Sequence, residues 1–264
     1  MKKTSFLPLT LILSTLAAIN VLGQTPDPNF HLYLLIGQSN MAGRGLVDLE
    51  SKQTNPRVEM LTKELTWKTA SDPVHFDKGS AGVGPGLSFG KEMAKANPKV
   101  RIGLIPCAVG GTSIKAWAPG MLDESTKTHP YDDMLKRVQE AQKAGVLAGI
   151  IWHQGESDQH SKLDYGQSLA NLIGLLRKDL KSPAVPFVAG ELSSFNPKGA
   201  NGTKKFNDVV QGLATKVENY ACVSGEGLKD KGDRLHCDAT SARILGKRYA
   251  EKMIELQKNS RIVP

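Results

Sequence analysis

The sequence has little cysteine and few aromatic residues. Its 3 cysteines among 264 residues are not spaced like the ligand pairs of a structural zinc site. Aromatic side chains make up 6% of the chain, too few to suggest a stacking platform for single-stranded nucleic acid. The formal net charge of +8 is mildly basic, and lysines and arginines are interspersed with acids, as in segment 247–252. We therefore expect no metal site and no nucleic-acid partner.

Long apolar runs are also lacking, apart from one at the start of the chain. Lys2 and Lys3 precede a mostly apolar stretch, residues 6–22, which is short for a membrane span and is interrupted by Pro8 and several polar side chains. This pattern is typical of a secretory signal peptide. We predict that residues 1–23 are removed, that the chain is exported to a periplasm or outside the cell, and that no stable membrane insertion remains. A retained anchor is the alternative.

An odd number of cysteines leaves at least one thiol unpaired in an exported protein. Cys107 ends an apolar run, which favours a buried thiol. Cys222 and Cys237 are the pair that we consider for a disulfide, although spacing alone does not establish it.

Apolar runs alternate with amphipathic segments through the rest of the chain. The middle runs are continuously apolar, as in strands buried on both faces of a sheet, and we place strands at 32–37, 57–62, 100–107, 146–153 and 185–191. Helical patterns cover 87–96, 131–144, 165–180 and 239–257. This alternation predicts an α/β fold, a parallel sheet covered on both faces, in one domain spanning 24–264. Segments 63–85 and 193–204 show little pattern, so we expect loops near the functional site.

Three polar motifs follow the ends of predicted strands. Gly37-Gln38-Ser39-Asn40-Met41 follows the first strand, Gly110-Gly111-Thr112 follows the third, and His153-Gln154-Gly155-Glu156-Ser157-Asp158 follows the fourth. Ligands of open parallel sheets bind beyond the carboxyl ends of the strands. We therefore expect the three motifs to meet at one edge of the sheet.

Ser39 is the candidate nucleophile, because a tight glycine turn after a strand presents its hydroxyl at the mouth of the sheet. A simple helix-capping serine is the alternative. Met41 stands where a Gly-x-Ser-x-Gly elbow has its second glycine, which argues against an α/β-hydrolase.

His236, in Asp233-Arg234-Leu235-His236, is the candidate base that takes the serine proton. Asp233 is placed to hold the far nitrogen of the same imidazole. Asp230 and Asp238 are rivals for this orienting role, and an ordinary charged surface loop is the alternative for the whole segment.

Three groups are candidates to stabilise an oxyanion: the backbone N–H of Ser39, the backbone N–H of Gly111 and the side-chain amide of Gln154. Gln38 and Asn40, which flank the serine, are candidate substrate-binding residues. Glu156 is expected to hydrogen-bond neighbouring loops and orient the site.

Two further interpretations involve the carboxylates of the fourth motif. Glu156 and Asp158 at a strand end suit a glycosidase, or a metal site together with His153 and His160. A carboxylate pair would leave Ser39 and the Asp-His pair unexplained, and the four ligands lack a known metal spacing. We keep both as minor alternatives.

Together these residues resemble the SGNH hydrolases, and specifically the sialate O-acetylesterase-like branch that includes the acetyl xylan esterases of carbohydrate esterase family 6. The resemblance rests on four ordered blocks: Gly37–Met41, Pro106–Ser113, Trp152–Asp158 and Asp233–His236. The third block stands where other SGNH enzymes have Gly-x-Asn-Asp.

The resemblance implies a three-layer α/β/α sandwich of flavodoxin-like type and metal-independent deacetylation without a cofactor, through an acetyl-enzyme. It implies a triad of Ser39, His236 and Asp233. It also implies oxyanion donors at Ser39, Gly111 and Gln154, where the role of Gln154 replaces that of the missing asparagine.

The sequence therefore predicts an exported serine esterase that removes O-acetyl groups from carbohydrates. Acetylxylan, related acetylated polysaccharides and acetylated sialic acid all fit as substrates. A general short-chain or lipid esterase and a catalytically inactive carbohydrate-binding protein on the same fold are the alternatives. The position deacetylated and the oligomeric state are left open.

Overall fold

The computed structural model describes residues 1, 25–195 and 200–260. The predicted signal peptide falls on residues outside this range, apart from Met1. Within the described residues no helix is both long and apolar enough to cross a membrane.

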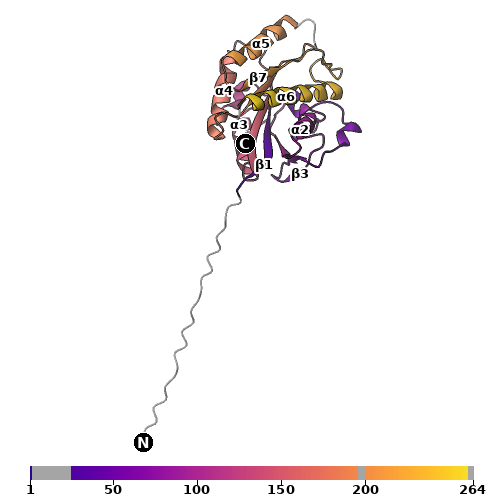
Figure 1. The fold of residues 1–264 in the computed structure, drawn as a ribbon. Coiled ribbons are helices and arrows are strands. Elements are labelled where there is room, and N and C mark those ends of the chain that lie inside the picture. The colour runs from indigo at the N-terminus through magenta and orange to yellow at the C-terminus, as the bar shows by residue number, and fades with distance from the viewer. Residues whose placement is uncertain (2–24, 196–199, 261–264) are drawn as a thin grey trace.

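One seven-stranded sheet forms the centre of the structure, in the order β3-β2-β4-β1-β5-β6-β7 (Figure 1). Its strands are β1 (Asp27–Gly37), β2 (Val58–Leu61), β3 (Trp67–Thr69), β4 (Arg101–Pro106), β5 (Gly145–His153), β6 (Phe187–Gly190) and β7 (Tyr220–Val223). β1 lies between β4 and β5 and pairs in parallel with both. The predicted parallel sheet is confirmed for every pair except β2 and β3, which run antiparallel.

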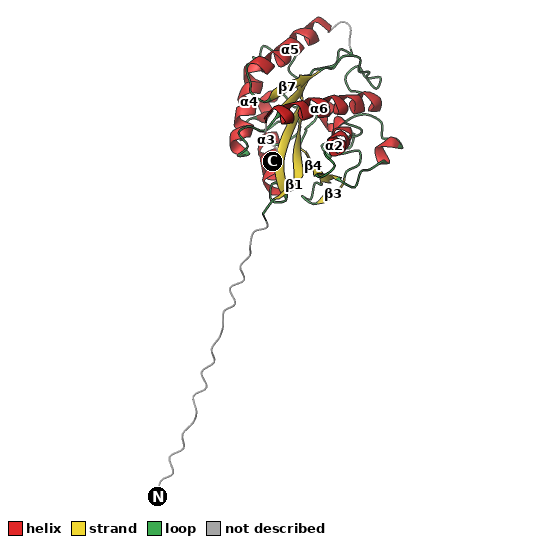
Figure 2. Cartoon of the chain, viewed as in Figure 1, coloured by secondary structure: helices red, strands yellow, loops and turns green. Residues whose placement is uncertain are grey.

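Helices cover both faces of the sheet, as Figures 1 and 2 show. They are α1 (Ser39–Ala42), α2 (Pro85–Ala96), α3 (Pro130–Ala141), α4 (Tyr165–Asp179), α5 (Ala200–Gly212) and α6 (Ala239–Ser260). One core cluster joins the sheet to α3, α4 and α5, and a second joins it to α1, α2 and α6. The predicted three-layer α/β/α arrangement is thereby confirmed.

The position of β1 between two helical layers explains why its side chains are apolar at successive positions. Leu32, Leu34 and Ile36 of β1 face the first core cluster, whereas Tyr33 and Leu35 face the second. Successive side chains of a strand point to opposite faces, so a strand between two helical layers must be apolar throughout. This is the continuously apolar pattern read from the sequence.

Four elements were not expected from the sequence: the single-turn helix α1, the helix α5 and the strands β3 and β7. β3 and β7 are only three and four residues long, too short to show a periodic pattern. The segment expected to be a loop at 193–204 contains the start of α5, while residues 196–199 lie outside the described part of the chain. α5 includes weak helix formers such as Asn201 and Gly202, and its burial of Phe206 and Val210 stabilises a helix that its propensities do not indicate.

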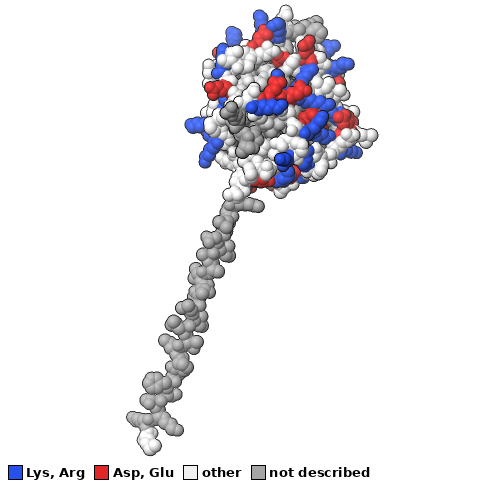
Figure 3. Space-filling model, in the orientation of Figure 1, with Lys and Arg blue, Asp and Glu red and all other residues white. Residues whose placement is uncertain are grey.

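The pairing of Cys222 with Cys237 that was considered from the sequence is not found: both thiols and that of Cys107 are free. Burial raises the pKa of each thiol, to about 11 for Cys107 and about 12 for the other two. On the face of the molecule seen in Figure 3, basic and acidic side chains are interspersed.

Candidate active site

Ser39 lies immediately beyond the carboxyl end of β1, at the point where the chain turns sharply into the short helix α1. Gly37 makes this turn with a φ of 127°, in a region that L side chains rarely adopt. A Cβ on Gly37 would also stand only 2.1 Å from the carbonyl oxygen of His153 on β5. The glycine therefore lets the nucleophile turn pack directly on the neighbouring strand.

The structure brings Ser39, His236 and Asp233 together. His236 Nε2 lies 3.0 Å from Ser39 Oγ, and His236 Nδ1 lies 2.7 Å from Asp233 Oδ2. With the ring proton on Nδ1, Nε2 offers its lone pair to the serine hydroxyl. This is the arrangement in which an imidazole removes a proton from serine while a carboxylate fixes its tautomer.

Asp233 is held as a carboxylate by several donors. Desolvation alone would raise its pKa, but the backbone and ring of His236, the Lys231 ammonium and the N–H of Leu235 hold the pKa well below its usual range. The rival aspartates have other partners. Asp230 accepts the N–H groups of Gly232 and Arg234, and Asp238 accepts that of Ser241 at the start of α6.

Asn40 connects the serine turn to the loop that carries His236. Its Nδ2 donates to Glu156 Oε1 at 2.5 Å and to the carbonyl oxygen of Leu235 at 3.1 Å. Its Oδ1 accepts the N–H of Cys237 at 3.0 Å. Asn40 is 5% exposed and both polar atoms of its side chain have protein partners, so it holds the loop that carries His236.

Gln154 differs from the sequence expectation. Its Nε2 lies within hydrogen-bond distance of three acceptors: Gln38 Oε1, the carbonyl oxygen of Thr112 and Asp158 Oδ2. Its Oε1 accepts the Tyr165 hydroxyl. An amide has only two N–H donors, and these are occupied, so the geometry leaves Gln154 no donor for an oxyanion.

Gln38 and Asp158 complete the same buried network. Gln38 Oε1 also accepts the N–H of Ser157, and Asp158 accepts the Ser113 hydroxyl and the N–H of Ile114. These contacts tie the three strand-end motifs to one another. Gln38 Oε1, like the Gln154 amide, therefore braces the site.

Two backbone donors remain beside Ser39. Across the described residues, no acceptor is found for the N–H of Ser39 or of Gly111, and Gly111 has a φ of 92°. The N–H of Gly110 points elsewhere, to Asp77 Oδ2 at 2.9 Å. A methyl group built on Gly110 would stand 3.4 Å from Ser39 Cβ, so the glycine turn and the serine are in close contact.

An ion pair that sequence reasoning missed fixes this glycine turn. Arg44 Nη2 lies 2.6 Å from Asp77 Oδ2, with the two side chains 6% and 2% exposed. The same carboxylate accepts the Gly110 N–H. Asp77 belongs to a segment without a periodic pattern, and no spacing relates it to Arg44, so no sequence signal marks the pair.

The carboxylates considered for a glycosidase or a metal site both contact protein groups, although the buried Glu156 Oε2 has no partner among the described residues. Asp158 is bound as described above, and Glu156 Oε1 accepts from Asn40 and lies 3.8 Å from His153 Nε2. His153 Nδ1 pairs with the Tyr249 hydroxyl at 3.1 Å, and burial lowers the pKa of its ring. Among the described residues, no group of three or more His, Cys, Asp or Glu side chains is placed to hold a metal ion.

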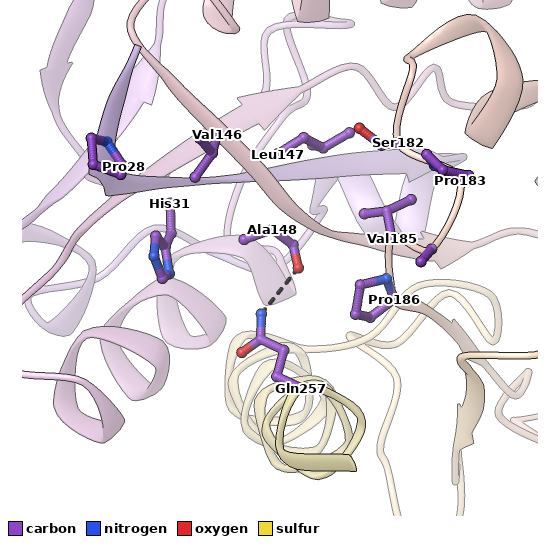
Figure 4. Close-up of a pocket in the computed structure, with 11 residues that line it drawn as sticks. Pro28, His31, Val146, Leu147, Ala148, Ser182, Pro183, Val185, Pro186 and Gln257 are labelled. Atoms are coloured by element: carbon purple, nitrogen blue, oxygen red, sulfur yellow. Dashed lines mark hydrogen bonds between the residues drawn. The ribbon is translucent and has the colours of Figure 1, made fainter. Parts of the chain in front are cut away.

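A separate cavity of about 400 Å³ lies at the amino ends of the strands, away from Ser39. It is formed where β1 and β5 begin and before β6, and is lined by Pro28, Val146 and Val185 (Figure 4). Gln257 of α6 closes one side and donates to the Ala148 carbonyl oxygen at 3.0 Å. This cavity lies at the amino ends of the strands, whereas Ser39 lies at their carboxyl ends, so the two are on opposite sides of the sheet's length.

Comparison with known proteins decides the family. The model of the carbohydrate esterase, sialic acid-specific acetylesterase family matches residues 29–255. The chain belongs to this family. A probable carbohydrate esterase of Arabidopsis thaliana is 34% identical over 252 residues, which cover 86% of this chain and 92% of that protein.

Solved structures agree with this assignment. An Arabidopsis thaliana protein has a TM-score of 0.75 and 32% identity, with 87% of this chain and 99% of that chain covered. NanS has a TM-score of 0.68 at 18% identity, over 89% of this chain and 99% of that one. A carbohydrate acetylesterase of Xanthomonas citri has a TM-score of 0.68 at 19% identity, over 88% of this chain and 57% of that one. The latter two likenesses concern the fold, which is that of the SGNH hydrolases.

Proposed function

We propose that this carbohydrate esterase is an exported serine esterase that removes O-acetyl groups from carbohydrates through an acetyl-enzyme. The observation that carries the proposal is the aligned series Asp233 Oδ2, His236 and Ser39 Oγ, with separations of 2.7 and 3.0 Å. Export rests on the signal-peptide pattern of residues 1–23. Acetylxylan, related acetylated polysaccharides and acetylated sialic acid are the candidate substrates.

The first half of the reaction transfers the acetyl group to Ser39. His236 Nε2 takes the hydroxyl proton as Ser39 Oγ attacks the ester carbonyl, and Asp233 stabilises the resulting imidazolium. The negative charge that develops on the carbonyl oxygen is bound by the N–H groups of Ser39 and Gly111. Each such donor is typically worth about 3 kcal/mol of barrier. The imidazolium then protonates the sugar oxygen as its bond to the carbonyl carbon breaks, and the sugar leaves with a free hydroxyl.

The second half releases acetate. A water molecule replaces the sugar and gives a proton to His236 while its oxygen attacks the acetyl carbonyl. The tetrahedral intermediate collapses, the Ser39 oxygen leaves, and His236 returns the proton to it. The same two backbone donors serve both tetrahedral intermediates, so the site needs no rearrangement between the steps.

The proposal is tested by measuring acetate release from acetylated xylan and from an O-acetylated sialic acid, with and without a chelator. We expect chelator-resistant release that disappears in Ser39→Ala. Ser182→Ala is the matched control, because Ser182 lies near the amino ends of the strands, away from Ser39, and its hydroxyl donates to the Leu180 carbonyl oxygen. Full activity in Ser39→Ala would overturn the serine mechanism. Polysaccharide binding without acetate release would favour a binding protein.

A further inference from the structure

A second cavity, of about 730 Å³, adjoins the glycine turn. Ala108 and Val109 form one of its walls and Phe76 forms another. Val109 donates its N–H to the carbonyl oxygen of Gly37, the residue that turns the chain toward Ser39. The cavity and the serine are thus neighbours separated by the residues of the glycine turn. Its volume is in the range of sites that hold small organic ligands.

The charge of this cavity is positive. Lys63, Lys78, Lys136 and Arg137 line it, together with two aspartates. One of these aspartates, Asp77, is already neutralised by Arg44, and the other, Asp133, lies 3.8 Å from Lys136. Within the described residues, neither Lys63 nor Lys78 forms an ion pair within 4 Å, and the four cations of the lining outnumber its two carboxylates, which favours an anionic ligand.

Lys78 also lies close to the reaction centre. Its Nζ is 3.9 Å from the position that a Cβ on Gly111 would occupy, and the N–H of Gly111 is one of the two proposed oxyanion donors. A ligand whose anionic group contacts Lys78 would therefore have a neighbouring group within reach of Ser39.

The remaining lining residues suit a sugar. Phe76 is 39% exposed, with the Arg137 guanidinium 4.8 Å from its ring centroid, and offers an apolar surface for the C–H groups of a pyranose. His75 lines the cavity and is 3% exposed, yet its Nε2 has no partner within the described structure. Burial lowers the pKa of His75 to about 4, so the neutral ring offers an acceptor to a hydroxyl or to a bound water.

We propose that this cavity binds a carboxylated sugar residue of the acetylated saccharide while the acetyl group lies at Ser39. The inference rests on the proposed esterase function and narrows its substrate class to saccharides that carry a carboxylate. The carboxylate pairs with Lys63 and Lys78. Two sources share this chemistry, a uronic acid branch on an acetylated polysaccharide and an acetylated sialic acid.

Matched pairs of substrates test the charge directly. One pair is an acetylated xylo-oligosaccharide with and without a glucuronic acid branch, and the other is an O-acetylated sialic acid and its methyl ester. We expect kcat/KM to be about 10-fold or more higher for the carboxylated member of at least one pair, and we expect this preference to shrink with added salt. The pair that shows the preference identifies the source. Equal kcat/KM within both pairs would overturn the proposal.

Lysine variants test whether Lys63 and Lys78 are the residues that recognise the carboxylate. We expect the double variant Lys63→Ala/Lys78→Ala to lose the preference through KM. The preference is the ratio of kcat/KM within one substrate pair, so an effect of Lys78 on the reaction centre that is common to both members cancels. The control is Lys95→Ala/Lys99→Ala, which removes the same charge from exposed positions beside the start of β4, at the opposite edge of the sheet. Loss of the preference in the control, or its survival in the double variant, would overturn the assignment.

Calorimetric binding of the carboxylated saccharide to Ser39→Ala separates this inference from the esterase proposal. Binding that is weakened by the double lysine change supports the subsite even if no ester is cleaved. Absence of binding, with small-ester hydrolysis intact in the unmodified protein, would overturn the subsite and leave the esterase proposal standing.

Discussion

Asn40 Oδ1 accepts the backbone N–H of Cys237 at 3.0 Å, across 197 positions of sequence. Asn40 directly follows Ser39, and Cys237 directly follows His236. The bond therefore fixes the neighbour of the candidate nucleophile to the neighbour of the candidate base. The separation of 3.0 Å between Ser39 Oγ and His236 Nε2 is set by the backbone on both sides as well as by the two side chains.

Removing this bond should weaken catalysis more than folding. We expect Asn40→Ala to lower kcat by about 100-fold, because small displacements of a base cost rates of that order. Asn207→Ala is the matched control, since Asn207 bonds both the N–H and the carbonyl oxygen of Leu192 in the same two-sided manner. Steady-state kinetics on a small acetyl ester measures both. Equal kcat values for Asn40→Ala and the unmodified protein would refute the role of Asn40 in positioning His236.

The orienting aspartate can be identified by substitution. We expect Asp233→Asn to lower kcat by about 10³- to 10⁴-fold, because an amide in place of the carboxylate no longer stabilises the imidazolium or holds the reactive tautomer. Asp238→Asn is the control, since asparagine also caps a helix well and Asp238 contacts Ser241. A larger loss in Asp238→Asn than in Asp233→Asn would contradict the assignment.

Gln154 should behave as a structural residue. Gln154→Ala leaves Gln38 Oε1, the Thr112 carbonyl oxygen and Asp158 with fewer donors in a buried site. We expect the free energy of unfolding to fall by about 2–4 kcal/mol, as measured by urea denaturation. Gln167→Ala, which removes an exposed amide that bonds Asn171, should change it by less than about 0.5 kcal/mol. Unchanged stability with a large loss of kcat in Gln154→Ala would instead favour an oxyanion donor.

Asp72 should make stability fall as the pH rises. Burial raises the pKa of its carboxyl to about 7, against an opposing effect of Arg243, and its Oδ1 has no partner among the described residues. Between about pH 4 and pH 7 the folded state retains a proton that the unfolded state has lost, so the free energy of unfolding decreases as the pH increases.

Asp72→Asn removes this titration. Relative to the unmodified protein, the variant should gain on the order of 2–4 kcal/mol between pH 4 and pH 7.5, measured by urea denaturation across that range. Asp208→Asn, an exposed position paired with Lys204, should follow the unmodified protein. A constant difference between Asp72→Asn and the unmodified protein at every pH would show that Asp72 ionises normally.

The sequence predicted the parts of the fold that have strong local patterns. β4, β5 and α4 were placed within a few residues, because most of their side chains are buried throughout or along one face. β1 begins five residues earlier than predicted, because its first three residues are not buried and give no apolar pattern. β3 and β7 were missed because each is a short strand at an edge of the sheet that depends on a neighbour for its pairing. α5 was missed because tertiary packing, and not propensity, stabilises it.

The site divides in the same way. Ser39, His236 and Asp233 were indicated by residue type at strand ends and by the short spacing of an Asp-x-x-His pair. The residues that hold these three in place were not indicated by the sequence. The Arg44–Asp77 ion pair, for example, joins residues that share no pattern. For Gln154 the sequence gave the residue type but not the direction of its amide. That direction depends on Thr112 and Asp158, whose positions only the packed structure defines.

The His236 loop follows β7, the last strand of the sheet, and precedes α6. A ribosome that has made residues 1–230 has therefore synthesised the whole sheet and the serine turn, but not the base that activates the serine. In such a chain Ser39 is an ordinary alcohol. In the proposed mechanism, activity therefore begins only when the last segment has emerged and its loop has joined Asn40, so incomplete chains and chains cut before Asp233 are inactive.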